Sequence, residues 1–224
     1  MVAALPLGFP HAPVPPPRLQ QRLQRVPDDV QHGDRRFVIY GVSWDQYVAI
    51  NDALGDRGAP RVCYCEGTLE LMSPGLLHEE KKKTIARLIE VYALVRDLPL
   101  QGAGCLTYRN KPKERGAEPD ECYFVGKAAE GRPPDLAIEV AVSRSALDKL
   151  SLYAGLGVRE LWIWRDGEIA VFYLGKNGYR QVKASKVVPR LDLAELTTFV
   201  RRDDQAAAVK AYWKRLQRKP IKRR

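Results

Sequence analysis

The sequence contains little cysteine and no long apolar run. Its four cysteines are spread over 224 residues, which is too few and too scattered for a disulfide scaffold. A membrane-spanning helix needs roughly 18 or more consecutive apolar residues, and no stretch of the chain approaches this length. The N-terminus also lacks the basic start and the uninterrupted apolar segment of a signal peptide. These absences argue against secretion and membrane insertion, and we expect a protein of the reducing cytoplasm.

Histidines and glycine-rich loops are scarce where a catalytic site would use them. Two of the three histidines lie in the proline-rich first 33 residues, so a Ser-His-Asp triad would have to run through His78. The Gly-Ala-Gly at 102–104 lacks the lysine and the following helix of a phosphate-binding loop, which disfavours nucleotide hydrolysis. Cys63 and Cys65 have no second close cysteine pair with which to hold zinc, and strand alternation points both sulfurs to one face. A buried strand face is the simpler interpretation of this pair.

The net charge of +10 is unevenly distributed along the chain. Residues 201–224 carry ten Lys or Arg against two Asp, and residues 1–36 carry five Arg against three Asp. Residues 37–200 hold 22 basic and 22 acidic side chains, so this part is electrically balanced. The basic C-terminal stretch either binds nucleic-acid phosphates without reading their sequence or serves as a solubilising tail.

Length and patterning predict one folded domain with an appendage at each end. Residues 1–36 are expected to be a disordered, proline-rich leader without a catalytic role. Residues 37–200 are expected to form the folded domain. Residues 201–224 are expected to form a basic C-terminal helix, over about 205–218, followed by a tail.

Apolar periodicity separates helices from strands within the folded part. Apolar residues at steps of three and four predict helices, and short β-prone runs predict strands. The expected helices are 44–54, 78–96 and 146–156, and the expected strands are 61–65, 68–72, 105–109, 118–125, 135–142, 160–164 and 170–174. Ser43 is expected to cap the first helix, and Glu66-Gly67 is expected to form the turn of a hairpin between the first two strands. The nearly all-apolar strand 135–142 is expected to be central. This order predicts the α/β (α+β) class, with one mixed central sheet flanked by helices.

Two carboxylates stand out in the predicted strands. Asp120 follows Pro119 at the start of one strand, and Glu139 interrupts the nearly apolar strand after it. An ionised carboxylate in a central strand is unfavourable unless it is paired or bound to a metal, so Glu139 needs a cation, which Asp120 could share. Lys149, on the following helix, could bring its amine to the same point. The alternative is a Glu139–Lys149 ion pair with only a structural role.

Several stretches, taken together and in order, resemble one known family. They are Glu66-Gly67, Met72-Ser73-Pro74 with His78, Glu118 to Cys122, Pro134 to Val140, and Lys149-Leu150 through Tyr153 to Trp162. Over about residues 37–200 the chain resembles the Uma-type restriction endonucleases of the PD-(D/E)XK nuclease superfamily. The resemblance implies a restriction-endonuclease-like fold, in which a mixed central sheet is flanked by helices.

The same resemblance implies roles for five residues. Asp120 and Glu139 match the two metal-binding acids, and Lys149 matches the lysine. The strict superfamily pattern places the lysine two positions after the second acid, where this chain has alanine, so the amine has to come from the helix. Glu66 and His78 match positions near the site.

The function that the resemblance implies is hydrolysis of DNA phosphodiester bonds. Asp120 and Glu139 would hold Mg²⁺, for which Mn²⁺ could substitute, and Lys149 would orient the attacking water or help to deprotonate it. No organic cofactor is required. A homodimer is expected, because cutting both strands usually needs two sites. The competing hypothesis is a non-catalytic nucleic-acid-binding or assembly module that retains the nuclease fold.

Overall fold

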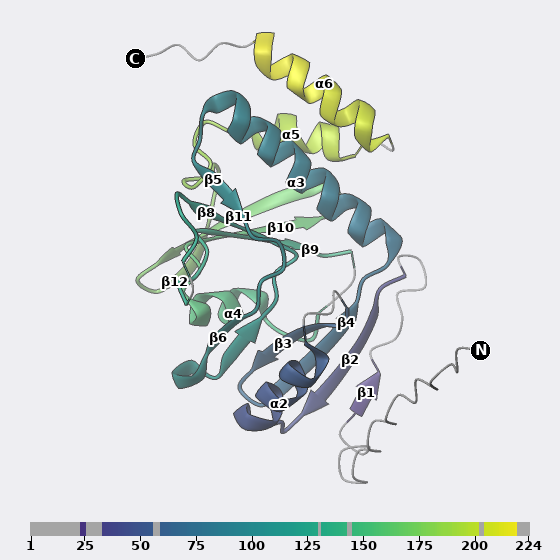
Figure 1. Cartoon of the computed structure of the whole chain (residues 1–224), viewed down its shortest axis with the longest axis vertical. Helices are drawn as coiled ribbons and strands as arrows, with labels where there is room; N and C mark the ends of the chain where they lie inside the picture. Colours follow the sequence, from purple (N-terminus) through teal and green to yellow (C-terminus); the bar gives the residue numbers. More distant parts are fainter. Residues whose placement is uncertain are drawn as a thin grey trace, which may run out of the picture.

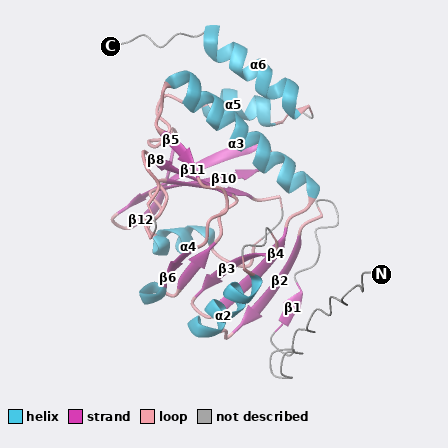
Figure 2. Ribbon diagram, viewed as in Figure 1, coloured by secondary structure: helices cyan, strands magenta, loops and turns pink. Residues whose placement is uncertain are grey.

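The computed structural model describes most of the chain, namely residues 23–25, 33–55, 59–129, 131–142, 145–201 and 204–218. Within this part, twelve strands form two six-stranded sheets, accompanied by five α-helices (Figures 1 and 2). Most of the predicted leader and the end of the predicted C-terminal tail lie outside the described residues. No described helix is both long and apolar enough to cross a membrane.

The first sheet is antiparallel, with the strand order β1-β2-β4-β3-β7-β6. Its strands are β1 (Leu23–Arg25), β2 (Arg35–Tyr40), β3 (Arg61–Cys65), β4 (Thr68–Ser73), β6 (Tyr108–Asn110) and β7 (Arg115–Ala117). β3 and β4 form the predicted hairpin, and the two residues of its turn, Glu66 and Gly67, have φ values of 43° and 85°. A two-residue turn with positive φ at both positions matches the twist of the paired strands, and glycine adopts this conformation readily.

Helix α2 (Trp44–Leu54) packs against this sheet. Ser43 caps its N-terminus as predicted: the Ser43 hydroxyl accepts from the Gln46 N–H at 3.3 Å, and the Gln46 side chain accepts from the Ser43 N–H at 2.9 Å. This reciprocal pair satisfies two amides that the helix leaves free. Tyr47 then stacks on Tyr64 of β3, with ring centroids 4.8 Å apart.

The second sheet is mixed, with the strand order β12-β11-β10-β9-β8-β5. Its strands are β5 (Leu100–Gly102), β8 (Glu121–Val125), β9 (Leu136–Val140), β10 (Glu160–Arg165), β11 (Glu168–Gly175) and β12 (Gly178–Val182). β9 pairs in parallel with β10 and antiparallel with β8, and all five of its residues are buried. The prediction that this strand is central to a mixed sheet is confirmed.

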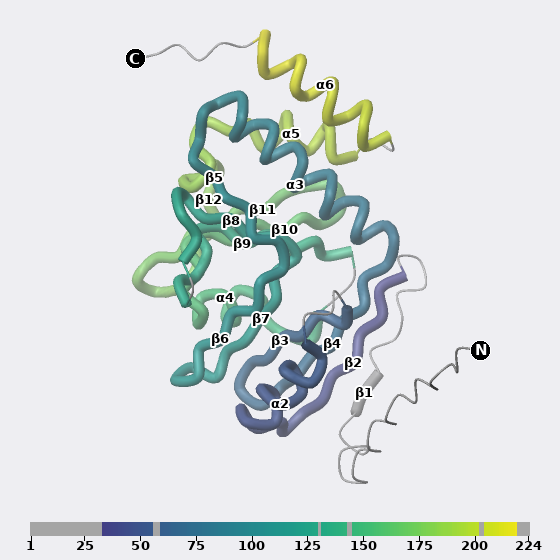
Figure 3. The backbone as a smooth tube through the Cα atoms, viewed as in Figure 1, coloured from purple at the N-terminus to yellow at the C-terminus, as the bar shows by residue number. Residues whose placement is uncertain are grey.

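Helices cover both faces of the second sheet (Figure 1). On one face lie α3 (Leu76–Arg96), α5 (Leu193–Val200) and α6 (Gln205–Arg218), and on the other lies α4 (Lys149–Leu156). Residues alternate along β9: Ile138 packs in the cluster beneath α3, whereas Ala137 packs in the cluster with α4. Glu139 shares the side of Ala137, so its side chain is directed to α4. α3 follows β4 almost directly and links the two sheets (Figure 3).

The α+β class with a mixed sheet between helices is confirmed, but the element order predicts one sheet where the described residues contain two. The predicted strand 118–125 begins only at Glu121, as β8, because Pro119 has no N–H to give to a ladder. β7, which was not predicted, precedes this proline and joins β3, whereas β8 follows it and joins β9. Helix α4 also begins at Lys149, three residues later than predicted, because Asp148 caps it by accepting from the Leu150 N–H at 3.0 Å.

Parts of the predicted leader, 1–36, belong to the fold. β1 pairs with β2, Arg35 begins β2, and Asp34 and Arg36 are buried. The predicted C-terminal helix is present as α6, and Tyr212 and Leu216 bury it against the core beneath α3. The ordered fold therefore extends past both predicted boundaries of the folded domain.

Gly116 of β7 offers a test of the packing between α2 and the first sheet. A Cβ at this position would overlap the hydroxyl of the fully buried Tyr47. We expect Gly116→Ala to lower the free energy of unfolding by about 1–3 kcal/mol, as overpacking does. Urea denaturation measures this loss. Gly175→Ala serves as a control, because its nearest neighbour would lie 3.6 Å away, and equal losses in the two variants would contradict the packing argument.

Candidate active site

Pairing between β8 and β9 brings Asp120 and Glu139 to the same end of the second sheet. The register places Glu121 opposite Ile138, so the preceding Asp120 faces the following Glu139. Facing residues of an antiparallel pair project to the same side. Asp120 Oδ2 accepts from the Val140 N–H at 2.6 Å, which fixes this carboxylate against the end of β9.

Glu139 is neutralised by two side chains of α4. Its Oε1 accepts a hydrogen bond from the Tyr153 hydroxyl, and its Oε2 lies 3.2 Å from Lys149 Nζ. Burial by itself raises the pKa of Glu139, but the Lys149 charge and the Tyr153 hydrogen bond outweigh it and leave this pKa below its ordinary value. Glu139 is therefore an ionised carboxylate at neutral pH.

Lys149 is the first residue of α4, and 16% of its side chain is exposed. Its ammonium also donates to Cys63 Sγ at 3.3 Å. Burial lowers the pKa of Lys149, but Cys63, Glu139 and Glu70 together raise it above its ordinary value. Of the two roles that the resemblance implies for Lys149, this environment supports a cation that orients water by donating hydrogen bonds, because a protonated amine cannot accept a proton.

Asp120 is held by side chains from two other elements. Its Oδ1 pairs with Arg61 Nη1 of β3 and lies 3.0 Å from His78 Nε2. His78 stands in the first turn of α3, fully buried, and its Nδ1 lies 3.3 Å from Asp34 Oδ2. The structure thus brings His78 to Asp120.

A second carboxylate–cation contact lies beside these groups, on the first sheet. Arg36 Nη1 of β2 donates to Glu70 Oε1 of β4 at 2.8 Å. Glu70 also accepts from the Ser145 hydroxyl at 3.0 Å and from the Ala146 N–H at 2.8 Å. The segment before α4 is therefore tied to β4.

Together these residues form what we call the buried charge cluster: Asp34, Arg36, Arg61, Glu70, His78, Asp120, Glu139 and Lys149. It joins the two sheets at the N-terminal end of α3. Four carboxylates stand against three permanent cations, an excess of one negative charge before His78 is counted.

Residues 44–204 match the sequence pattern of the Uma2 family, which is described as "Putative restriction endonuclease". The chain belongs to the Uma2 family. One similar solved structure is described as that of "a putative nuclease belonging to DUF820 from Anabaena variabilis ATCC 29413"; it is 12% identical, with a TM-score of 0.48, over 71% of this chain and 99% of that chain. No curated protein matches. Uma2 membership confirms the resemblance and supports a nuclease-like function with DNA as the substrate class.

In this Uma2 protein Glu66 lies away from the buried charge cluster. It occupies the β3–β4 turn, where its side chain is 67% exposed and pairs with Arg115 at 2.9 Å. Arg61, which contacts Asp120, stands at the other end of β3. Five residues of extended strand span roughly 17 Å. The structure therefore does not bring Glu66 to the other predicted site residues, and Glu70 is the carboxylate of this hairpin that faces the cluster.

Sequence analysis missed four members of the cluster. Asp34 and Arg36 fell in the predicted leader, in which no site residue was expected, and Arg61 and Glu70 lie on the predicted hairpin. One signal was present for Glu70, because it stands between two leucines in a β-prone run. A charged residue inside an apolar strand is the same signal that singled out Glu139.

The donor set of the cluster suits Mg²⁺ in type and charge. Mg²⁺ takes oxygen ligands, commonly one or two carboxylates completed by water, and Asp120 and Glu139 offer such oxygens beside a net negative charge. Within the described part of the chain, no three His, Cys, Asp or Glu side chains are arranged to hold a metal. The protein ligands would thus be few, and Arg61 and Lys149 already neutralise both carboxylates.

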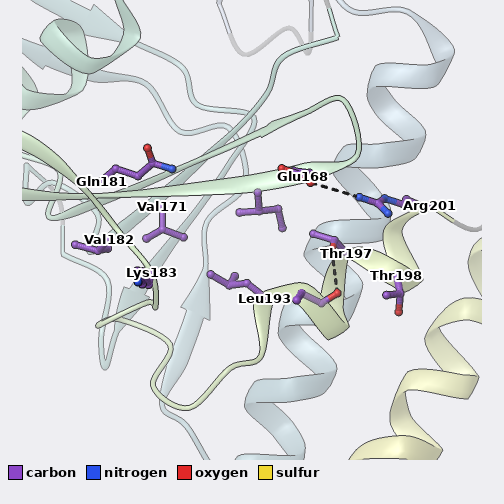
Figure 4. A pocket seen from close by; sticks show the side chains of 11 residues that line it. Glu168, Val171, Gln181, Val182, Lys183, Leu193, Thr197, Thr198 and Arg201 are labelled. Carbon is purple, nitrogen blue, oxygen red and sulfur yellow. Dashed lines mark hydrogen bonds and ion pairs between the residues drawn. The ribbon is translucent and has the colours of Figure 1, made fainter.

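A cavity of about 530 Å³ opens beside Glu139 and Lys149, and Arg36, Ser145 and Arg165 are among the residues that line it. A larger one, of about 740 Å³, lies between β11, β12 and α5 (Figure 4). Its polar groups are engaged locally. Thr197 donates to the Ala194 carbonyl at 2.9 Å, and Arg201 lies 4.0 Å from Glu168. We place the candidate site at the smaller cavity, because Glu139 and Lys149 line it.

Replacing Lys149 with methionine tests how far Glu139 depends on its partner. Methionine keeps the aliphatic packing and removes the charge, which leaves a buried carboxylate without its nearest cation. We expect Lys149→Met to lower the free energy of unfolding by about 3 kcal/mol near pH 8. Urea denaturation measures this loss, and Lys127→Met, at an exposed position, should change the same quantity by less than about 0.5 kcal/mol.

The loss should depend on pH. In the wild type the pKa of Glu139 lies below its unfolded value, so its stabilisation is present above about pH 4.3 and is lost as the pH falls through the folded pKa. In the variant burial dominates and raises this pKa, so the deficit should shrink as the pH falls from about 8 towards 4.5. A deficit that stayed constant over this range would mean that the loss does not come from an ionised Glu139 without its partner.

Proposed function

We propose that this Uma2 protein is a Mg²⁺-dependent endonuclease that hydrolyses DNA phosphodiester bonds, with Mn²⁺ able to substitute. The observation that carries the proposal is the convergence of Asp120 and Glu139 at facing positions of β8 and β9, with Lys149 Nζ 3.2 Å from Glu139. Two acids and one amine are the groups that the family resemblance implies for this chemistry, and the chain belongs to a family described as "Putative restriction endonuclease".

Each member of the site has a role that follows from its contacts. Asp120 and Glu139 would hold the cation, which when bound supplies charge stabilisation to the phosphate. Lys149 donates hydrogen bonds and orients water, because its raised pKa keeps it protonated. His78, between Asp34 and Asp120, is a positioning residue that fixes the Asp120 carboxylate.

Substitution of the two acids tests the proposal directly. We expect Asp120→Asn and Glu139→Gln each to abolish Mn²⁺-dependent cleavage of plasmid DNA, because each removes a charged ligand while keeping the shape of the side chain. The measurement is the rate of plasmid nicking, with circular dichroism to verify the fold. Glu66→Gln is the matched control, since Glu66 lies in the distant turn, and it should cleave like the wild type. Wild-type nicking by either site variant would refute the assignment.

Helix α6 supplies a surface suited to the DNA backbone. Its buried side carries Ala208, Tyr212 and Leu216. Lys210, Lys214 and Arg218 recur at four-residue steps on the opposite, exposed side. None of these three makes an ion pair within the described residues. An unpaired basic row on a rigidly packed helix is able to neutralise phosphates without reading base sequence.

Removing this row should weaken DNA binding and its dependence on salt. We expect a Lys210→Ala, Lys214→Ala, Arg218→Ala variant to lose up to about 0.9 units of log–log salt slope for each phosphate contact removed. Fluorescence anisotropy with a labelled duplex measures this slope. A control with Lys113, Lys127 and Lys176 changed to alanine removes the same charge from exposed positions elsewhere. Equal slopes in the two variants would mean that α6 does not contact DNA.

A non-catalytic nucleic-acid-binding or assembly module is the second candidate function. One observation favours it: both acids of the site are already neutralised within the chain, by Arg61 and Lys149. Thermal melting with Mn²⁺ separates the two candidates, because a ligand that binds the native state raises the melting temperature.

We also propose a homodimer for the nuclease, so that two sites act on two strands. Sedimentation with duplex DNA tests this proposal.

A further inference from the structure

Arg61 is the arginine of the buried charge cluster that contacts Asp120. Only 4% of its side chain is exposed, and Nη1 pairs with Asp120 Oδ1. Its charge also lowers the pKa of Glu139, after the larger effects of burial, Lys149 and Tyr153. Arg61 thus acts on both carboxylates that the proposed function assigns to the metal.

Arg61 has a second carboxylate within reach. Its Nη2 donates to Glu79 Oε1 at 2.7 Å, and Glu79, in the first turn of α3, also lies 2.5 Å from Lys82. The Glu79 side chain is 36% exposed, whereas that of Asp120 is 1% exposed. The guanidinium therefore bridges a buried carboxylate and one at the protein surface.

A divalent cation and a guanidinium cannot both neutralise the same buried oxygen. Two cations a few ångströms apart in a poorly solvated site repel strongly. Asp120 Oδ2 accepts from the Val140 N–H, and Arg61 and His78 contact Oδ1, so a metal bound to this carboxylate would lie close to the Arg61 guanidinium.

We propose that Arg61 is the resident counter-ion of the metal site, and that it has to move from Asp120 towards Glu79 before a divalent cation binds. The inference rests on the proposed function, since it assumes that Asp120 is a metal ligand. Glu79 is able to receive the full charge. Burial raises the pKa of Glu79, but Lys82, Arg61 and His78 lower it by more, so Glu79 stays ionised. In the metal-free protein Arg61 reduces the repulsion between Asp120 and Glu139. It also lowers the affinity of the site for a metal.

The proposal predicts a change in metal affinity that is opposite in direction to the change expected for a purely structural arginine. If Arg61 only supported the shape of the site, its removal would weaken metal binding or leave it unchanged. If Arg61 competes with the metal, its removal tightens binding. We expect Arg61→Met to bind Mn²⁺ at least about tenfold more tightly than the wild type, which corresponds to about 1.4 kcal/mol. Isothermal titration with Mn²⁺ alone, without DNA, measures the dissociation constant.

Arg36→Met is the matched control. Arg36 is a buried arginine of the same cluster, and it pairs with Asp34 and Glu70. The Arg36→Met variant removes the same charge but leaves Arg61 paired with Asp120. It should therefore change the Mn²⁺ dissociation constant much less than Arg61→Met does. Equal tightening in both variants would reflect the loss of any positive charge in the cluster and would overturn the displacement proposal.

Arg61→Lys keeps the experiment decisive if Arg61→Met does not fold. Lysine retains the charge but lacks the fork that bridges Asp120 and Glu79, so its Mn²⁺ affinity should lie between those of the wild type and Arg61→Met. Affinity at or below that of the wild type in every folded Arg61 variant would overturn the proposal.

Asp120→Asn separates failure of this inference from failure of the proposed function. If the wild type binds Mn²⁺ and Asp120→Asn does not, the metal site stands whatever the Arg61 variants show. If no variant binds Mn²⁺, including those of Arg61, the metal site itself is wrong, and the displacement proposal falls with it.

Discussion

The arrangement of the site depends on one physical constraint, which is the burial of a carboxylate in the central strand. Glu139 lies in β9, whose residues are all buried, and an ionised group there has to be neutralised. Lys149 and Tyr153 do so from a single helix. They are four residues apart, and this spacing places both on one face of α4. The same contact therefore positions α4 against the sheet and keeps Glu139 ionised.

Asp120 imposes a second constraint, because its partners come from distant parts of the chain. Arg61 belongs to the first sheet, His78 to α3 and Val140 to the second sheet. The residues proposed for chemistry are therefore also those that hold the two sheets together. In such an arrangement activity and stability change together, and a loss of cleavage is informative only when the fold of the variant has been measured. Isosteric substitutions suit this site better than truncation to alanine for that reason.

The sequence predicted the features that depend on interactions between neighbouring residues. The Ser43 cap, the hairpin turn at 66–67 and the carboxylate inside β9 each depend on a few neighbouring residues, and the structure contains all three. Sequence did not predict the contact of Arg61 with Asp120, because strand register across two sheets determines it. The resemblance pointed to Glu66, which the turn directs to solvent, whereas register places Glu70 opposite Cys63, on the face that meets α4.

Neutralisation within the chain also stabilises the buried charge cluster itself. Four buried carboxylates with no counter-charge would repel one another and take up protons. Arg36, Arg61 and Lys149 reduce this repulsion. Under the proposed function, metal binding would be an exchange of one cation for another, and its strength would depend on how readily Arg61 can be transferred to Glu79. Activity in such a protein depends on the partners of the two acids as much as on the acids themselves.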